Sequence, residues 1–251
     1  MEAATVIVYP SCAITVSDFY YEHYGFCPIC QAPTRFVARH AWFRDHYHCD
    51  ACGSLPRQRA LIQVIGQVFA DWRQMDIFEP SPSGPASERL KRDSSHYVSS
   101  YCFAGIAPGT MHDGFRCEDV ERLTFPDASF DLVVTQEVFE HVFDYRRGFR
   151  EVMRVLRRGG AHVFTTPKYS HLRRSEDRAT RRDGRVVHLH DPEYHGNPID
   201  EGGSLVTVHY GDDLPEIIWH ETHCPTTAYV IRESRTGTIA DFMDVFVTRK
   251  L

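Results

Sequence analysis

Four cysteines, arranged in two pairs, are the residues whose type and spacing indicate chemistry most directly. Cys27 and Cys30 form one Cys-x-x-Cys pair, and Cys49 and Cys52 form another after 18 intervening residues. A tight knuckle at each pair can direct two thiolates at one ion, and this spacing is typical of a zinc ribbon. A redox pair or two buried dithiols are the alternatives. Four sulfur ligands leave no open coordination position, so we expect a structural rather than a catalytic zinc ion.

The segment between the two pairs has the composition of a small β-hairpin. Residues 34–48 contain strand-forming side chains that can pack on the metal knuckles, namely Phe36, Val37, Trp42, Phe43 and Tyr47. Because four cysteines already satisfy tetrahedral zinc, the histidines nearby are interpreted as surface groups: His40, His46 and His48. The remaining cysteines are scattered and are expected to be small buried hydrophobes: Cys12, Cys102, Cys117 and Cys224.

A long segment, residues 168–203, concentrates cationic and imidazole side chains. It lacks clear hydrophobic periodicity, and such a stretch inside a domain is typical of a lid or a binding loop. Its arginines could recognise a phosphate, a carboxylate or a nucleotide-bearing substrate: Arg173, Arg174, Arg178, Arg181, Arg182 and Arg185. Glu176, Asp177 and Asp183 partly cancel this charge, which favours a solvated loop. The same segment contains three histidines: His188, His190 and His195.

Composition excludes several classes of protein. With 251 residues, 42% of them hydrophobic, the chain can bury the core of one domain and carry a small additional module. Asp and Glu number 34 against 28 Lys and Arg, a net charge of -6, which argues against a nucleic-acid or membrane-surface partner. No stretch approaches the roughly 18 apolar residues of a membrane helix, and the chain opens with Glu2 rather than a basic signal region. We therefore expect a soluble, cytoplasmic protein.

The order of elements divides the chain into four parts. Residues 1–26 are expected to form an irregular arm and residues 27–53 the ribbon. Residues 54–75 predict a linking helix that starts near Pro56, because apolar residues recur at helical spacing from Leu61 to Trp72. From residue 76 to residue 251, short β-rich runs alternate with amphipathic segments, which predicts a doubly wound α/β domain with a lid-like insertion at 168–203.

The middle of this domain gives the clearest βαβ unit. Residues 130–135 form an apolar run suited to a buried parallel strand, and residues 145–157 place Phe149, Val152, Met153 and Leu156 on one helical face. Gly159-Gly160 is expected to end that helix before a strand at 161–166. Near the end of the chain, a helix at 212–222 precedes strands at 226–232 and 242–248, which we expect to pair in antiparallel orientation.

Three segments carry a resemblance to a known family. Residues 118–134 read EDVERLTFPDASFDLVV, residues 136–142 read QEVFEHV, and residues 154–160 read RVLRRGG. Together with the final helix and strands they resemble class I S-adenosylmethionine-dependent methyltransferases with a type 11 domain, over residues 76–251. The resemblance implies a Rossmann-like sheet of seven strands with the last one antiparallel. It also implies a cofactor that lies across the carboxyl ends of the strands.

The resemblance assigns cofactor contacts to particular residues. Asp119 would accept a hydrogen bond from the adenine amino group, with Val120 against the ring, and Gln136 and Glu137 would flank the methionine end. In the turn after the first strand, the family's acidic residue is retained as Glu79. Serine and proline replace most of the family's glycines there. The cofactor contacts expected from this region are Glu79, Ser81 and Gly84, with Ser100 at the ribose edge.

Methyl transfer requires alignment of the acceptor with the methyl group, and a hydroxyl or amine acceptor can also require a general base. Histidine is the natural candidate for that base. His141 lies four residues beyond Glu137, and His195 lies in the insertion, so these two are predicted as catalytic residues, with structural or solvated histidines as the alternative.

The sequence therefore predicts a methyltransferase that modifies an oxygen or nitrogen of a small-molecule acceptor such as a sugar or a specialised metabolite. Two alternatives remain: an RNA methyltransferase that grips RNA through the ribbon, and a non-catalytic scaffold that keeps the fold. Only Arg35, Arg39 and Arg44 are basic between the cysteine pairs, too few for a phosphate track. The sequence is compatible with a homodimer but does not identify the oligomeric state.

Overall fold

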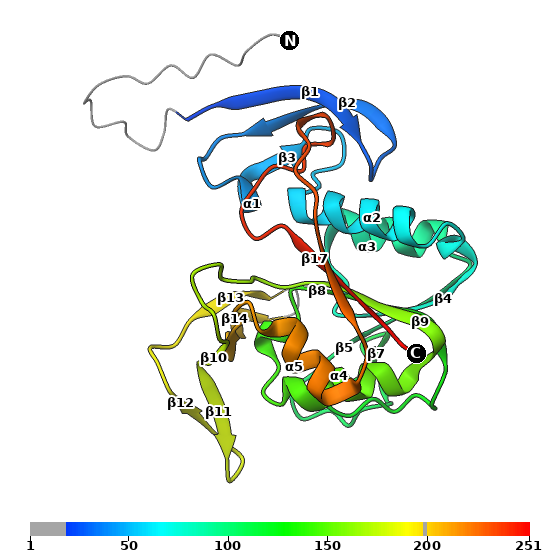
Figure 1. Ribbon diagram of the computed structural model, residues 1–251, viewed down its shortest axis with the longest axis vertical. Coiled ribbons are helices and arrows are strands. Elements are labelled where there is room, and N and C mark those ends of the chain that lie inside the picture. Colours follow the sequence, from blue (N-terminus) through cyan, green and yellow to red (C-terminus); the bar gives the residue numbers. More distant parts are fainter. Residues whose placement is uncertain (1–18, 198–199) are drawn as a thin grey trace.

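The computed structural model describes residues 19–197 and 200–251. Its centre is a twisted sheet in which eight strands are described, in the order β16-β17-β9-β8-β4-β5-β7-β6 (Figure 1). The strands are β4 (Asp76–Pro80), β5 (His96–Tyr101), β6 (Met111–His112), β7 (Phe115–Cys117), β8 (Phe130–Gln136), β9 (Leu156–Thr165), β16 (Thr226–Val230) and β17 (Asp244–Arg249).

The pairing of these strands confirms the predicted Rossmann-like fold. Strands β7, β5, β4, β8 and β9 run parallel, and β17 is antiparallel to both of its neighbours, β9 and β16. The sheet has one strand more than the seven expected, because β6 folds back on β7. Asp113 and Gly114 make that hairpin, both with positive φ, the conformation that matches the twist of paired strands.

Helices cover both faces of the sheet (Figure 1). Helices α2 (Pro56–Val68) and α3 (Gly84–Asp93) pack on one face, and α4 (Tyr145–Val155) and α5 (Leu214–Thr222) pack on the other. Successive residues of β8 alternate between these layers, since Val134 joins the α2 side and Val133 the α4 side. In the described part of the chain, no helix is long and apolar enough to cross a membrane.

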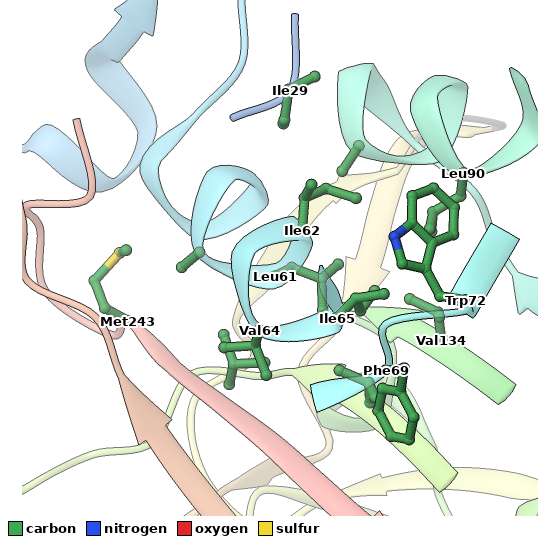
Figure 2. Close-up of a cluster of buried hydrophobic side chains, with 14 of the residues drawn as sticks. Ile29, Leu61, Ile62, Val64, Ile65, Phe69, Trp72, Leu90, Val134 and Met243 are labelled. Atoms are coloured by element: carbon green, nitrogen blue, oxygen red, sulfur yellow. The ribbon is translucent and has the colours of Figure 1, made fainter. Parts of the chain in front are cut away.

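Helix α2 does more than link two parts of the chain. Its apolar residues Leu61 and Ile65 are fully buried and lie in one cluster with Leu90 of α3 and Val134 of β8 (Figure 2). The helix ends at Val68, and the short 3-10 helix η2 (Trp72–Gln74) follows. The predicted helix is therefore confirmed for residues 56–68, where its apolar residues face the sheet, whereas Trp72, which the periodicity included, lies in η2.

The ribbon module, residues 19–53, is a three-stranded antiparallel sheet with strand order β1-β2-β3. Its elements are β1 (Tyr21–Cys27), β2 (Ala32–Ala38), α1 (Phe43–His46) and β3 (Tyr47–Cys49). The prediction of an irregular arm is therefore wrong for residues 21–26. Their backbone pairs with β2, and the Tyr21 ring packs on the rings of Phe43 and Tyr47. The rest of that arm, residues 1–18, lies outside the described residues.

Buried arginines hold the ribbon module on the main domain. Arg59 of α2 is fully buried and donates to the carbonyl oxygens of Tyr47 at 3.0 Å and Gly237 at 2.7 Å. Arg89 of α3 donates to the carbonyl oxygens of Pro28 and Ile29 in the first cysteine knuckle. Gly237 follows η4 (Ser234–Thr236), in the loop between β16 and β17 that reaches the ribbon sheet (Figure 1). The ribbon therefore has a fixed position.

The insertion is built from short paired strands rather than irregular chain. These are β10 (Glu176–Asp177) with β15 (Val208–His209), β11 (Ala179–Arg182) with β12 (Arg185–His188), and β13 (Tyr194–Asn197) with β14 (Asp200–Leu205). The turn at Asp183 and Gly184 has two positive φ angles and closes the β11–β12 hairpin. Most side chains of that hairpin are exposed, so its strands lack the alternation of apolar and polar residues from which strands are predicted. Residues 198 and 199 lie outside the described part.

One predicted boundary is wrong. Helix α4 ends at Val155, and β9 begins directly at Leu156, so Gly159 and Gly160 lie inside the strand rather than at the end of the helix. Gly159 has a φ of +80°, and a Cβ on Gly160 would lie 2.7 Å from the carbonyl oxygen of Asp131. The glycine pair thus serves a bulge between β8 and β9.

Candidate functional site

A cavity of about 340 Å³ lies at the carboxyl ends of the parallel strands, and we call it the sheet-end cavity. It is lined by six of the residues singled out from the sequence: Ser81, Asp119, Val120, Gln136, Glu137 and His141. These residues come from the loops after β4 and β7, and from the last residue of β8 and the segment that follows it. A cavity of this size at the ends of parallel strands is a typical small-molecule site.

Glu79 lies beneath this cavity rather than on its surface. It is fully buried, its Oε1 accepts hydrogen bonds from Gln136 Nε2 and Ser87 Oγ at 2.7 Å each, and its Oε2 accepts one from Tyr97 OH at 2.6 Å. Burial raises the pKa of Glu79, against the effect of these three donors. Glu79 therefore fixes the orientation of the Gln136 amide, which does line the cavity.

Two other predicted residues also lie outside the lining. Ser100 is fully buried, and its hydroxyl has no hydrogen-bond partner among the described residues, while Cys102, just past the end of β5, faces the cavity instead. Gly84 begins α3 with a φ of +73°, and the Gln58 side chain of α2 occupies the place where a Cβ would lie. Gln58 itself lines the cavity, so it covers the start of α3.

The turn after β4 keeps a left-handed backbone without the family's glycine. Ser81 has a φ of +53°, and its backbone N–H donates to the carbonyl oxygen of Ser100 at 2.7 Å. The Ser83 backbone N–H donates to Ser87 Oγ at 2.8 Å. These hydrogen bonds hold a conformation that glycine adopts more readily. The replacement of glycine by serine therefore does not remove the turn.

The loop after β7 is held in place by carboxylates. Asp119 Oδ1 accepts from the backbone N–H of Glu121 at 2.9 Å. Glu121 Oε1 in turn accepts from the backbone N–H groups of Phe143 and Asp144 across the cavity mouth. Arg181 of the insertion also reaches this edge, with its guanidinium 4.1 Å from the centre of the Phe143 ring. One arginine of the insertion therefore contributes to the site instead of facing only solvent.

An arginine of the ribbon module approaches the opposite end of the cavity, which sequence reasoning missed. Arg44 of α1 forms an ion pair with Glu137, and their side chains are only 10% and 18% exposed. Arg57 donates to Asp45 Oδ1 at 2.5 Å and to the carbonyl oxygen of Arg44 at 3.1 Å. Burial opposes ionisation of Glu137, but Arg44 and Arg57 outweigh it and lower the pKa of Glu137.

A second cavity of about 500 Å³ adjoins the first, and we call it the lid cavity. Both cavities are lined by Arg57, Glu137, His141 and Gly196. The lid cavity adds an aromatic wall, in which the Phe242 ring lies 6.0 Å from the Trp42 ring and 5.1 Å from the Tyr169 ring, measured between centroids, and it adds the charged residues Arg44, Asp45 and Glu193.

The two histidines predicted as catalytic lie side by side at the junction of these cavities. The ring centroids of His141 and His195 are 5.2 Å apart. His141 Nδ1 lies 2.9 Å from the carbonyl oxygen of Leu205, and burial lowers the pKa of His141. Burial and the neighbouring Glu137 raise the pKa of Glu140 to about 8. His188 and His190 are exposed on the insertion and line neither cavity.

The four paired cysteines converge at one point of the ribbon module. Their sulfur atoms all lie within 4.8 Å of one another, with Cys27 to Cys52 and Cys30 to Cys49 both at 3.8 Å. Tetrahedral zinc with Zn–S bonds of ~2.3 Å places its sulfur ligands ~3.8 Å apart. The donor set and its geometry therefore fit a tetrahedral zinc ion.

The cysteines in the described part of the chain form no disulfide bond. Cys117 and Cys224 are buried, as expected for scattered cysteines, whereas Cys102 is exposed toward the sheet-end cavity. The expectation of burial is wrong for Cys102, because it lies just past the end of β5 where the strand leaves the core. Cys12 lies outside the described residues.

Comparison with known proteins agrees with this geometry. Residues 93–164, from the end of α3 to β9, match the family described as a methyltransferase domain. A 2-methyl-6-phytyl-1,4-hydroquinone methyltransferase from Synechocystis sp. is 26% identical over 141 residues, which cover 49% of this chain and 44% of that protein. A probable S-adenosylmethionine-dependent methyltransferase from Mycolicibacterium smegmatis is 43% identical over 52 residues, 21% of this chain and 20% of that protein.

The chain thus matches less than half the length of these curated relatives. Among solved structures, an S-adenosylmethionine-dependent methyltransferase from Mesorhizobium loti aligns with a TM-score of 0.49 and 18% identity, over 76% of this chain and 98% of that one. The family match and the named relatives support an S-adenosylmethionine-dependent methyltransferase domain.

Proposed function

We propose that this protein is an S-adenosylmethionine-dependent methyltransferase that modifies an oxygen or nitrogen atom of a small-molecule acceptor. The observation that carries the proposal is the convergence of Asp119, Val120, Gln136 and Glu137 on one cavity at the carboxyl ends of the strands. The match of residues 93–164 to a methyltransferase domain supports the same reaction class.

The polar groups of the sheet-end cavity suit this cofactor. The Asp119 carboxylate would accept a hydrogen bond from the adenine amino group, with Val120 against the ring. Glu137 Oε1 is buried at the other end and has no hydrogen-bond partner among the described residues, so it is available to a cationic amino group. When bound, S-adenosylmethionine supplies an activated sulfonium methyl group. With Gln136 and Glu137 at its methionine end, the cofactor would have that end next to the lid cavity, which Glu137 also lines.

The lid cavity suits a small polar acceptor. Its volume of about 500 Å³ falls within the usual range for small-molecule sites, and it combines an aromatic wall with Arg44 and Glu193. Such a combination favours a sugar or another hydroxyl-rich ring, whose apolar face packs on aromatic side chains while its polar edge meets charged groups.

His141 and His195 are the proposed proton acceptors for this acceptor. The hydrogen bond from His141 Nδ1 to the Leu205 carbonyl places the ring proton on Nδ1 and leaves Nε2 with its lone pair. The lowered pKa of His141, caused by burial, keeps the ring neutral and therefore able to accept a proton.

We also propose that the four ribbon cysteines hold a structural zinc ion. The sulfur separations of 3.8 Å support it, and so does the buried contact of the first knuckle with Arg89. The ion would fix α1, which carries Arg44 to the lid cavity. An RNA-gripping ribbon is not favoured, because Arg35 is paired with Glu22 and Asp50 and Arg44 is paired with Glu137.

The test is calorimetric titration of zinc-loaded protein with S-adenosylmethionine and with S-adenosylhomocysteine. We expect micromolar binding that Asp119→Ala weakens by about ten-fold or more, since a hydrogen bond to a charged group contributes ~1.5–3 kcal/mol. Asp71→Ala, an exposed carboxylate with no described side-chain bond, is the matched control. Absence of binding by folded, zinc-loaded protein would overturn the proposal and leave the scaffold alternative.

A further inference from the structure

Three potential metal ligands meet where the two cavities join. Glu140 and His141 belong to the short 3-10 helix η3 (Phe139–His141), and His195 belongs to β13 of the insertion. One ligand atom of each residue lies within 4.8 Å of the others, and Glu140 Oε1 is 3.9 Å from His141 Nε2. The cluster is separate from the four cysteines of the ribbon module.

The second polar atom of each of these side chains is already engaged. Thr166 Oγ1 donates to Glu140 Oε2 at 3.0 Å, His141 Nδ1 lies 2.9 Å from the Leu205 carbonyl oxygen, and His195 Nε2 lies 3.2 Å from Glu193 Oε1. A carbonyl and a carboxylate accept hydrogen bonds, so these contacts place a proton on each of those two nitrogens and leave the other nitrogen of each ring with a lone pair. Histidines that bind metal ions typically have this arrangement.

The Glu140 carboxylate gives an independent indication that an ion binds here. The residue is only 1% exposed, and its Oε1 has no hydrogen-bond partner among the described residues. A buried carboxylate oxygen normally has a partner, and this one points toward the free nitrogen of His141 instead. The contact with His141 at 3.9 Å is too long for a hydrogen bond and leaves space for an ion between the two atoms.

We propose that Glu140, His141 and His195 bind a divalent first-row transition-metal ion. Two imidazoles and one carboxylate suit zinc, cobalt, iron or manganese better than magnesium or calcium, which favour oxygen ligands. Ligand atoms ~2.1 Å from an ion lie roughly 3 to 4.2 Å apart, so the 3.9 Å separation already fits and the widest one must close by less than 1 Å. Three protein ligands leave open coordination positions.

The position of the site suggests what those open positions receive, and this part rests on the proposed function. His141 lines both cavities, so an ion held there adjoins the methionine end of the sheet-end cavity and faces the lid cavity. A bound cation stabilises the ionised form of a coordinated hydroxyl. The proposal therefore names oxygen, rather than nitrogen, as the acceptor atom. With the ion bound, the coordinated hydroxyl would release its proton to solvent, and His141 and His195 would act as ligands instead of the proton acceptors proposed for the metal-free site.

The test is titration of Co²⁺ into protein that already carries one zinc ion per chain, followed by calorimetry and visible absorption. We expect one further Co²⁺ per chain without the thiolate-to-cobalt absorption that exchange at the cysteines would give. His195→Gln and Glu140→Gln should each weaken this binding at least about ten-fold. His188→Gln, an exposed histidine of the same insertion, should leave it unchanged.

Saturable binding that His195→Gln does not weaken, or no second Co²⁺ at all, would overturn the metal site. His195 is partly exposed, so its variant is expected to fold even if replacement of the buried Glu140 disturbs the structure. Titration of the same samples with S-adenosylhomocysteine separates the two proposals. Absence of cobalt binding by the wild-type protein with retained cofactor binding rejects the metal site alone, whereas cobalt binding by the wild-type protein without cofactor binding supports the metal site and rejects the methyltransferase function.

Discussion

The ion pair between Arg44 and Glu137 joins the ribbon module to the main domain, and Arg44→Met tests what it contributes. The side chains are 10% and 18% exposed, Arg44 contacts Glu137 Oε2, and Glu137 Oε1 has no hydrogen-bond partner among the described residues. Removing one member of a fully buried pair costs about 3–5 kcal/mol. Because Glu137 keeps some exposure and Arg57 remains nearby, we expect Arg44→Met to lower the free energy of unfolding by about 2–4 kcal/mol.

The assay is a double-mutant cycle measured by urea unfolding near pH 7.5, with Arg44→Met, Glu137→Gln and the double variant. Since the charge of Glu137 is unfavourable only when Arg44 is missing, the double variant should be more stable than the sum of the single effects predicts, by at least about 1.5 kcal/mol. Arg35→Met is the matched control within the ribbon. Its partner Asp50 is 51% exposed and Arg35 itself is 38% exposed, so that change should cost less than about 1 kcal/mol.

Additive effects of Arg44→Met and Glu137→Gln, within about 0.5 kcal/mol, would refute the reasoning, because they would show that neither charge depends on the other. A cost for Arg35→Met as large as that for Arg44→Met would also contradict it. In that case the stability of the ribbon, rather than burial of the pair, would explain both results.

Three further predictions concern the metal, the pH dependence and the packing of the ribbon. Cys30→Ser should lower the ribbon's zinc content, measured by elemental analysis after removal of loosely bound metal, from about one ion per chain to near zero. Burial lowers the pKa of His162 from 6.5 to about 3, so between these values only the unfolded chain binds the proton, and stability falls as pH decreases. From pH 6.5 to pH 5 the wild type should lose about 2 kcal/mol more than His162→Gln in urea unfolding, and equal losses would contradict the assignment. Gly237→Ala should lower the free energy of unfolding by about 2–3 kcal/mol, because φ is +66° and the new Cβ would lie 2.8 Å from the Phe36 ring. Gly184→Ala is the control, since Gly184 has a φ of +74° but open space around it. In the same thermal or urea unfolding assay, that change should lower the free energy of unfolding by only about 1 kcal/mol.

Features with a local physical cause were predictable from the sequence. The buried run of β8 and the amphipathic face of α4 appear as hydrophobic periods, and both elements lie within a few residues of the expected positions. The two cysteine pairs specify a site by spacing alone, and their sulfur atoms do converge. Asp119 and Glu137 were assigned through the family resemblance of the segments that contain them, and both line the sheet-end cavity.

Features that depend on segments far apart in the chain were not predictable in this way. Nothing near Arg44 indicates that it meets Glu137, 93 residues later, since docking of the ribbon through Arg59 and Arg89 brings them together. The exposed hairpins of the insertion carry no hydrophobic alternation, so their pairing was missed.

The sequence by itself therefore determined the type of fold, the cysteine site and the loops that line the first cavity. Each of these depends on residues close together in the chain, whose spacing expresses the geometry of a knuckle, a strand or a helix. Only the tertiary structure decided that Glu79 lies beneath the cavity and that Glu140 and His141 meet His195. Those arrangements are set by how whole elements pack, and packing energy depends on shape and burial that a local pattern does not record.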